Sequence, residues 1–189
     1  LRKPKKKTPG VFEKAEKLSF EFENNRIVGY RWNHPEQKKV LIVHGFESTA
    51  KNFDRYIMPL VKKGYEVLAF DAPAHGSSGG KRINLPLYAR AIRHIGELYG
   101  PIDSYIAHSF GGLALAHYLE TLPESQQIKA VMIAPATETT SAIDSFFQFL
   151  QLSAEIRKEF DNLILEIGGV PPDHYSIRRA MNNISGDIL

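Results

Sequence analysis

The chain has 189 residues, 43% of them hydrophobic, which is enough to bury the core of one globular domain. It contains no run of the roughly eighteen apolar residues that a membrane-spanning helix needs, and its lack of cysteine excludes disulfides and thiolate chemistry. The net charge of +3 does not indicate nucleic-acid binding, because five of the 24 Lys and Arg residues lie within residues 1–7 and the remaining 19 face 21 Asp and Glu.

Residues 1–17 are expected to form a basic, flexible tail. No apolar segment of the kind that a secretory signal requires follows the first charges, so we expect a cytoplasmic protein without a membrane span. Leu1 is not an initiator methionine, which indicates that the native start has been processed or lies upstream.

The first half of the chain alternates strand-like and helix-like patterns. Residues 18–23 and 26–32, joined by Asn24-Asn25, predict an antiparallel hairpin. Continuous apolar runs then predict buried strands, and amphipathic stripes predict helices between them. In chain order these are a strand at 40–43, a helix from Asn52 to about Lys63, a strand at 65–70 and a helix from about Leu85 to Tyr99.

The second half continues this alternation and then changes. A strand at 102–107, a helix ending near residue 121 and a strand at 128–134 complete the alternating pattern, which indicates a parallel sheet with crossover helices. Beyond Pro135 only helical patterns follow, at 142–152, 154–167 and 173–184.

The stretch Ala-His-Ser-Phe-Gly-Gly at 107–112 lies between a predicted strand and a predicted helix. A sharp turn there requires small residues two before and two after the serine, and Ala107 and Gly111 meet that requirement. Such a turn strains Ser109, exposes its Oγ and directs the next N–H into the same space. The alternative is an ordinary strand-to-helix connection in which Ser109 merely starts the helix.

This stretch resembles the nucleophile elbow, G-x-S-x-G, of the α/β-hydrolase superfamily, with Ala107 in place of the first Gly. His44-Gly45-Phe46 is similar to the H-G-x segment after the third strand of that superfamily. Residues 71–78 are similar to the D-x-P-G-H-G-x-S loop after its fourth strand, with Ala74 in place of Gly. All three motifs follow proposed parallel strands, where open α/β sheets place their ligands.

The resemblance covers nearly the whole chain from about residue 18 and implies an α/β-hydrolase fold, a mostly parallel sheet with crossover helices. It implies a hydrolase core at 18–136, a helical cap at 137–184 and the start of the next core strand at 185–189, with the fold incomplete at the C-terminus.

By resemblance, the protein is a serine hydrolase that cleaves a carboxylic ester or thioester through an acyl-enzyme on Ser109, with the N–H groups of Phe46 and Phe110 as oxyanion hole. Each such donor stabilises the oxyanion by about 3 kcal/mol. No cofactor is implied, and the aromatic cap indicates a small apolar substrate. An acyltransferase or C–C hydrolase on the same serine is one alternative. A non-catalytic ligand-binding protein on the same scaffold is the other.

A serine nucleophile needs a base and an orienting acid, which in this superfamily follow the serine in the order acid, then histidine. Downstream of Ser109 the histidines are His117, about 12 Å along the same helix, and His174 in the proposed cap. Neither stands where the family places its base. We therefore expect the chain to be truncated, with its acid and base beyond Leu189.

Other motifs are weaker. By resemblance, His44 and His75 are structural rather than catalytic. Residues 77–81 resemble a phosphate-binding loop, but that motif needs Gly at 75 and Ser or Thr at 82. The seven histidines form no compact ligand pair in the sequence, so no metal site is indicated.

Overall fold

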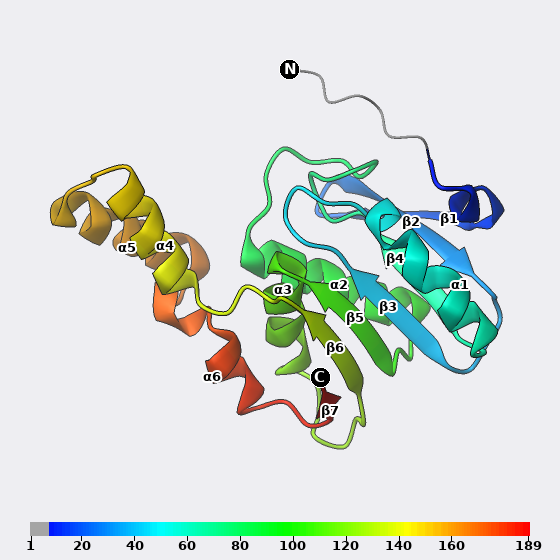
Figure 1. Cartoon of the computed structure of the whole chain (residues 1–189). Helices are drawn as coiled ribbons and strands as arrows, with labels where there is room; N and C mark the ends of the chain where they lie inside the picture. The colour runs from blue at the N-terminus through cyan, green and yellow to red at the C-terminus, as the bar shows by residue number, and fades with distance from the viewer. Residues whose placement is uncertain (1–7) are drawn as a thin grey trace.

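The computed structural model describes residues 8–189 (Figure 1). Their core is a seven-stranded sheet in the order β1-β2-β4-β3-β5-β6-β7. The strands β1 (Glu16–Phe22) and β2 (Asn25–Trp32) form the expected antiparallel hairpin, and β2 is also antiparallel to β4. The pairs from β4 through β7 are parallel, which confirms the predicted mostly parallel sheet.

The expected flexible tail lies partly outside the described residues, at 1–7, and is wrong for residues 10–17. The 3₁₀ helix η1 (Gly10–Lys14) buries Phe12, whose ring packs edge-to-face against Tyr30 at 4.9 Å and Trp32 at 5.0 Å between centroids. The Trp32 Nε1–H also donates to the Val11 carbonyl at 2.9 Å. One buried aromatic thus anchors a segment whose sequence is mostly polar.

Helices cover both faces of the sheet (Figure 1). The remaining elements of the alternating part match the predicted ones to within a few residues: β3 (Lys39–Val43), η2 (Ala50–Phe53), α1 (Asp54–Lys62), β4 (Glu66–Phe70), α2 (Leu85–Tyr99), β5 (Ser104–His108), α3 (Phe110–Leu119) and β6 (Lys129–Ile133). On β3, Leu41 and Val43 pack with α2 and α3, whereas Val40 and Ile42 pack with α1. Burial on both faces explains the continuous apolar run.

The chain after β6 forms the helices α4 (Thr139–Phe149) and α5 (Ala154–Gly168), as predicted, and a less regular end. The single helix expected at 173–184 is wrong: it divides into η3 (Pro172–His174) and α6 (Ile177–Met181). Ser176 interrupts it with extended backbone, where it pairs with Glu138 and accepts a capping bond from the Arg179 N–H.

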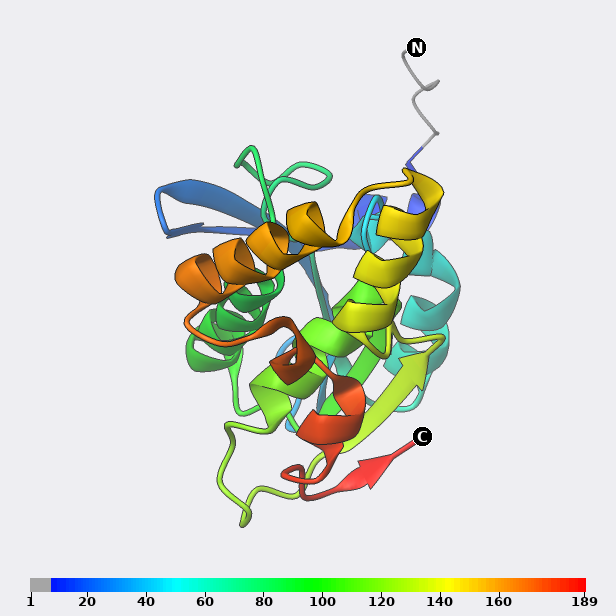
Figure 2. The same cartoon turned by 90° about the vertical axis from the view of Figure 1, so that its left-hand side faces the viewer.

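Helix α6 packs on α3, and α5 lies beside the first turns of α2 and α3 (Figure 2). The chain then reaches β7 (Asp187–Ile188), a two-residue strand parallel to β6 within the expected span 185–189. Within the described part of the chain, none of the helices combines the length and the hydropathy needed to cross a bilayer.

Candidate active site

Ser109 stands in a strained turn between β5 and α3. Its backbone has φ 52° and ψ −126°, a conformation that costs a non-glycine residue about 1–3 kcal/mol. The end of β6 holds it there, because the Ser109 N–H donates to the Ile133 carbonyl at 3.1 Å and the Ser109 carbonyl accepts from the Ala136 N–H at 3.1 Å. The predicted strand, sharp turn and helix are confirmed.

The hydroxyl of Ser109 does not act as an ordinary helix cap. Although Ser109 occupies the N-cap position of α3, its side chain makes no capping hydrogen bond to the residues described. The alternative in which this serine merely starts the helix therefore lacks the bond that would define it.

Small residues let the turn approach β3. Ala107 is fully buried, and a Cβ on Gly111 would collide with the His44 carbonyl oxygen and lie 2.8 Å from that of Val43. A Cβ on Gly45 would lie 3.0 Å from the Ser109 Cβ. The elbow and the segment after β3 are thus in backbone contact, which is the reason for the small residues on both.

Phe46 and Phe110 flank the serine. Their rings meet edge-to-face with centroids 6.3 Å apart, and the Phe46 ring is 62% exposed. Phe110 is the first residue of α3, so its N–H has no acceptor in the helix. For the Phe46 N–H, no acceptor is present within residues 8–189. Two N–H groups without acceptors, on the two residues that flank the serine, are compatible with an oxyanion hole.

His44 is buried and fully engaged. Its Nε2 accepts from the Ala72 N–H at 2.8 Å, so the hydrogen lies on Nδ1, which donates to the Gly45 carbonyl at 2.8 Å. Burial lowers the pKa of His44, which keeps the ring neutral. Its carbonyl accepts from the Tyr88 hydroxyl at 2.9 Å. His44 thereby ties the ends of β3 and β4 to α2.

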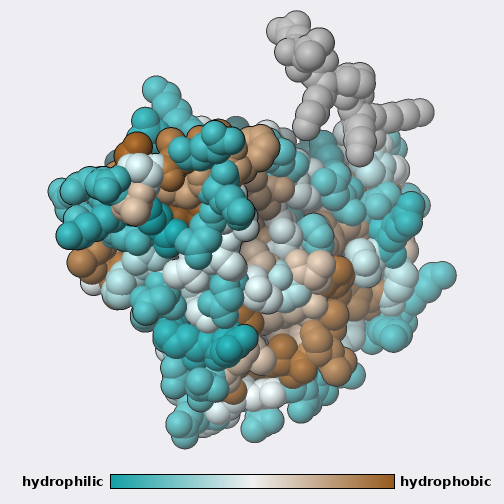
Figure 3. All heavy atoms as spheres, turned by 60° about the vertical axis from the view of Figure 1, so that its left-hand side comes forward, coloured by the Kyte–Doolittle hydropathy of each residue, from teal (hydrophilic) through white to brown (hydrophobic). Residues whose placement is uncertain are grey.

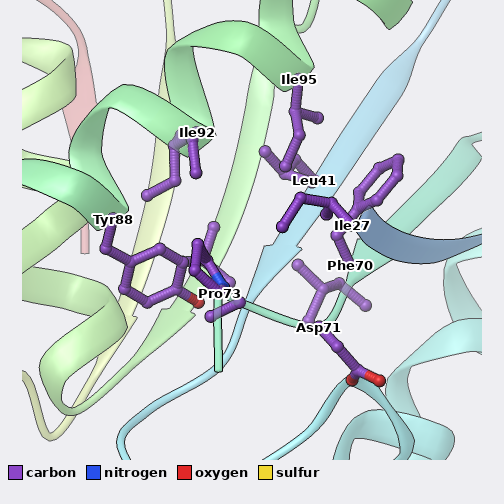
Figure 4. Close-up of a pocket in the computed structure, with 12 residues that line it drawn as sticks. Ile27, Leu41, Phe70, Asp71, Pro73, Tyr88, Ile92 and Ile95 are labelled. Atoms are coloured by element: carbon purple, nitrogen blue, oxygen red, sulfur yellow. The ribbon is translucent and has the colours of Figure 1, made fainter. Parts of the chain in front are cut away.

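The loop after β4 is organised by Asp71. Its carboxylate accepts from the Ala50 N–H at 2.9 Å and the Ser77 N–H at 2.8 Å, and Figure 4 shows it pointing away from the α2 side chains. His75 connects this loop to the one after β3, because its Nε2 accepts from the Glu47 N–H at 3.2 Å and its Nδ1 lies 3.0 Å from the Pro73 carbonyl. Both ring nitrogens are therefore used by the backbone.

Ala74 occupies a glycine-like position. It is the residue at which this loop departs from the superfamily pattern, and its φ is 62°, in the left-handed region that favours glycine. The departure therefore places backbone strain in the loop beside Phe46 and His75.

His117 and His174 lie together, joined to α6. The His117 Nδ1 is 3.0 Å from the Glu120 carboxylate, which accepts from the Arg179 Nη2 at 2.6 Å, and the rings of His117 and His174 are 5.7 Å apart. Within the described residues, neither histidine hydrogen bonds to Ser109. These four side chains are called the α3–α6 cluster below.

In this cluster, folding brings together three side chains that could act as metal ligands, although His174 is far from the other two in the sequence. One ligand atom each of His117, Glu120 and His174 lies within 4.8 Å of the others. The Arg179 guanidinium already contacts the first two, at 3.4 Å and 2.6 Å, and places a positive charge beside the position a cation would need. The arrangement therefore serves first as a polar bridge between α3 and α6.

Acidification is expected to destabilise this bridge. Burial, opposed by the Glu120 charge, lowers the pKa of His117 below its ordinary value of 6.5, so the unfolded chain binds the proton more readily and stability falls as the pH drops below about 6.5. For Glu120, burial acts in the opposite sense, but the hydrogen bond and charge of Arg179 outweigh it and lower the pKa below 4.5, so protonation at still lower pH costs further stability.

Urea unfolding between pH 7.5 and 5 tests this, with His117→Gln expected to flatten the decline in the free energy of unfolding. His44, whose pKa burial also lowers, titrates in both proteins and leaves a residual slope. An unchanged slope in the variant would contradict the assignment.

Two cavities border the phenylalanines that flank the serine, and a third lies inside the core. The first, of about 590 Å³, is bounded by Phe110, the start of α2 and the apolar face of α5. The second, of about 600 Å³, is bounded by Phe46, His75 and the Lys81-Arg82 segment. The third is a void of about 10 Å³ inside the core between α2 and the sheet (Figure 4), too small for a substrate.

The helix predicted at 154–167 supplies one side of the apolar cavity. The apolar positions of α5, including Phe160, Leu163 and Ile167, recur at helical spacing and remain half exposed, and Figure 3 shows hydrophobic atoms on the face where these helices lie. In the sequence, Lys81 and Arg82 stand out only as part of a segment that resembles a phosphate-binding loop but does not match its motif. Their position beside Phe46 results from the fold of the loop.

Comparison with known proteins agrees with this geometry. Residues 34–165 match the family described as serine aminopeptidase, S33. A human protein named serine hydrolase-like protein is 30% identical over 103 residues, covering 52% of this chain and 50% of the relative. A probable serine hydrolase of Drosophila melanogaster is 25% identical over 172 residues, covering 80% and 52%. The chain thus spans about half the length of these relatives.

Solved structures show the same fold. An esterase from Pyrococcus furiosus superposes with a TM-score of 0.65 at 22% identity and covers 100% of this chain and 74% of its own. The thioesterase domain from the curacin biosynthetic pathway gives 0.60 at 19% identity, with coverage of 88% and 67%. Fold, elbow and family match agree, and the chain belongs to the serine aminopeptidase S33 family of α/β hydrolases.

Proposed function

We propose that this protein is a serine hydrolase that cleaves a carboxylic ester or thioester through an acyl-enzyme on Ser109. The observation that supports this most directly is the strained conformation of Ser109 at the turn into α3, with a hydroxyl free of capping bonds beside the N–H groups of Phe46 and Phe110. In this proposal the elbow supplies the nucleophile and one oxyanion donor, the Phe110 N–H, and the segment after β3 supplies the other, the Phe46 N–H.

In the proposed reaction, the Ser109 Oγ attacks the substrate carbonyl carbon while a base takes its proton. The N–H groups of Phe46 and Phe110 donate to the resulting oxyanion, since two donors directed at the developing charge lower the barrier. The C–O or C–S bond then breaks, the leaving group departs with a proton, and water releases the acid from the serine ester.

The base is the remaining requirement. His44 and His75 have both ring nitrogens engaged by the backbone, and His117 lies in the α3–α6 cluster. Within residues 8–189, none of the histidines hydrogen bonds to Ser109, so the proposal still needs a base that reaches its hydroxyl. We propose further that residues 137–184 act as a cap, because α5 forms one wall of the apolar cavity beside Phe110.

Covalent labelling tests the nucleophile directly. The protein, expressed from its complete native reading frame, is incubated with a fluorophosphonate, and its intact mass is measured before peptide mapping. We expect one adduct, located on Ser109 and missing from Ser109→Ala. Because the probe needs an activated serine, a folded protein without an adduct would overturn the proposal and favour a non-catalytic ligand-binding protein.

A further inference from the structure

The two cavities that border Phe110 and Phe46 differ in chemistry. Phe110 lines the apolar cavity, Phe46 lines the charged one, and the two rings are in edge-to-face contact. A substrate carbonyl held by the N–H groups of these residues would therefore extend one substituent into each cavity.

The apolar cavity suits an acyl chain. Apolar side chains dominate its lining, among them Leu85 at the start of α2 and Phe160, Leu163 and Ile167 on α5, while Asn84, Thr139 and Tyr175 add polar atoms. The one cation there, Arg90, is held by both oxygens of Glu23 at 2.8 Å and 3.2 Å. Apart from Arg90, such a lining presents no charged side chain to a charged substituent, whose desolvation would be costly.

The second cavity has the opposite character. Lys81 and Arg82 line it, both are exposed, and neither is ion-paired with a carboxylate in the 8–189 region. His75 adds a ring whose nitrogens are occupied by the backbone, and Glu47 contributes the one carboxylate of the lining. Two free cations against one carboxylate leave a site that attracts anions.

From this asymmetry we infer that the substrate is an acyl ester or thioester whose leaving group is anionic, with the acyl chain bound under α5 and the phosphate or carboxylate of the leaving group bound by Lys81 and Arg82. The inference rests on the proposed acyl-enzyme at Ser109. Cleavage transfers the acyl carbon from sulfur or oxygen to the Ser109 Oγ, and the anionic thiol or alcohol leaves from the second cavity.

Three thioesters with the same octanoyl chain test the charged cavity. Octanoyl-coenzyme A carries phosphates, S-octanoyl glutathione carries carboxylates, and octanoyl-N-acetylcysteamine is neutral. We expect kcat/KM to be higher for at least one anionic thioester than for the neutral one, and the stronger of the two to identify the anion. The preference should shrink as salt is added.

Charge removal locates the preference. Lys81→Gln combined with Arg82→Gln is expected to lower the ratio of anionic to neutral kcat/KM by roughly five- to thirty-fold, because each exposed pair contributes about 0.5–1 kcal/mol. Lys62→Gln with Lys63→Gln removes the same charge at the exposed end of α1 and should keep the ratio. If wild type has the same kcat/KM for anionic and neutral thioesters, the charged subsite is refuted. It is also refuted if both double variants lower the ratio of anionic to neutral kcat/KM by the same factor.

Two leucines of α5 provide a matched test of the apolar cavity. Leu163 and Leu165 are 46% and 47% exposed, but of the two only Leu163 lines the cavity. In wild type, kcat/KM should rise about four-fold for each methylene added between acetyl and octanoyl. Leu163→Gln should reduce this dependence and Leu165→Gln should not, and identical behaviour of the two variants would exclude the cavity as acyl site.

Binding without chemistry separates this inference from the proposed function. S-octyl coenzyme A is a thioether that cannot be cleaved, and calorimetry measures its binding. Binding that weakens in the Lys81 and Arg82 double variant, in a protein with neither esterase nor thioesterase activity, would support the two-cavity site and refute the hydrolase. Thioesterase activity that is equal for anionic and neutral thioesters and for short and long acyl chains would support the hydrolase and refute the two-cavity site.

Discussion

Replacing Ser109 by alanine is expected to lower kcat/KM for ester hydrolysis by about 10⁴-fold or more, because no other group in the proposed mechanism can form the acyl intermediate. The substitution removes one oxygen and keeps the backbone. The rate is measured with an activated ester of the octanoyl chain, and circular dichroism checks that the variant is folded.

Ser109→Gly adds a second readout at the same position. At φ 52° and ψ −126° glycine is unstrained, so this variant should be as inactive as Ser109→Ala but more stable by about 1 kcal/mol in urea unfolding. Residual activity within ten-fold of wild type in either variant would place the nucleophile elsewhere. A stability equal to that of Ser109→Ala would mean that the elbow is not strained.

Gly111→Ala is expected to have the largest effect on stability, a loss of about 3 kcal/mol or more. Its new Cβ would collide with the carbonyl oxygens of His44 and Val43, which are backbone atoms of β3 and the segment after it and cannot rotate away. For a chain of this length the melting temperature should fall by roughly 6–12 °C. Activity should fall too, since displacing the elbow separates Ser109 from the Phe46 N–H.

Gly10→Ala is the matched control, because a Cβ on Gly10 meets no atom of the described residues within 4 Å. The expected change is within about 0.5 kcal/mol. The two variants carry the same substitution, so their difference in thermal unfolding measures the contact between elbow and β3. Equal stabilities would refute the close packing on which the oxyanion geometry depends.

Much of the core was predictable because local patterns and tertiary burial agree there. The run at Val40–Val43 is apolar on both sides of the strand, and the structure buries both sides. The turn at Ser109 was predictable for a similar reason. Small residues are required at 107 and 111 because two backbone segments pass in contact there. Prediction failed where one long-range contact outweighed local composition, as when Phe12 anchors η1 against Tyr30 and Trp32.

The alternating α/β order, the mostly parallel sheet and the serine turn follow from the sequence, because they depend on residue size and hydrophobic period within short segments. Which histidine rings are engaged depends on tertiary contacts: loop backbone binds His44 and His75, and Glu120 of α3 and Arg179 of α6 contact His117. The fold also brings an apolar and a cationic cavity to the two sides of the Phe46–Phe110 contact, because the residues that line them come from loops and helices far apart in the chain, and their proximity has no local signal.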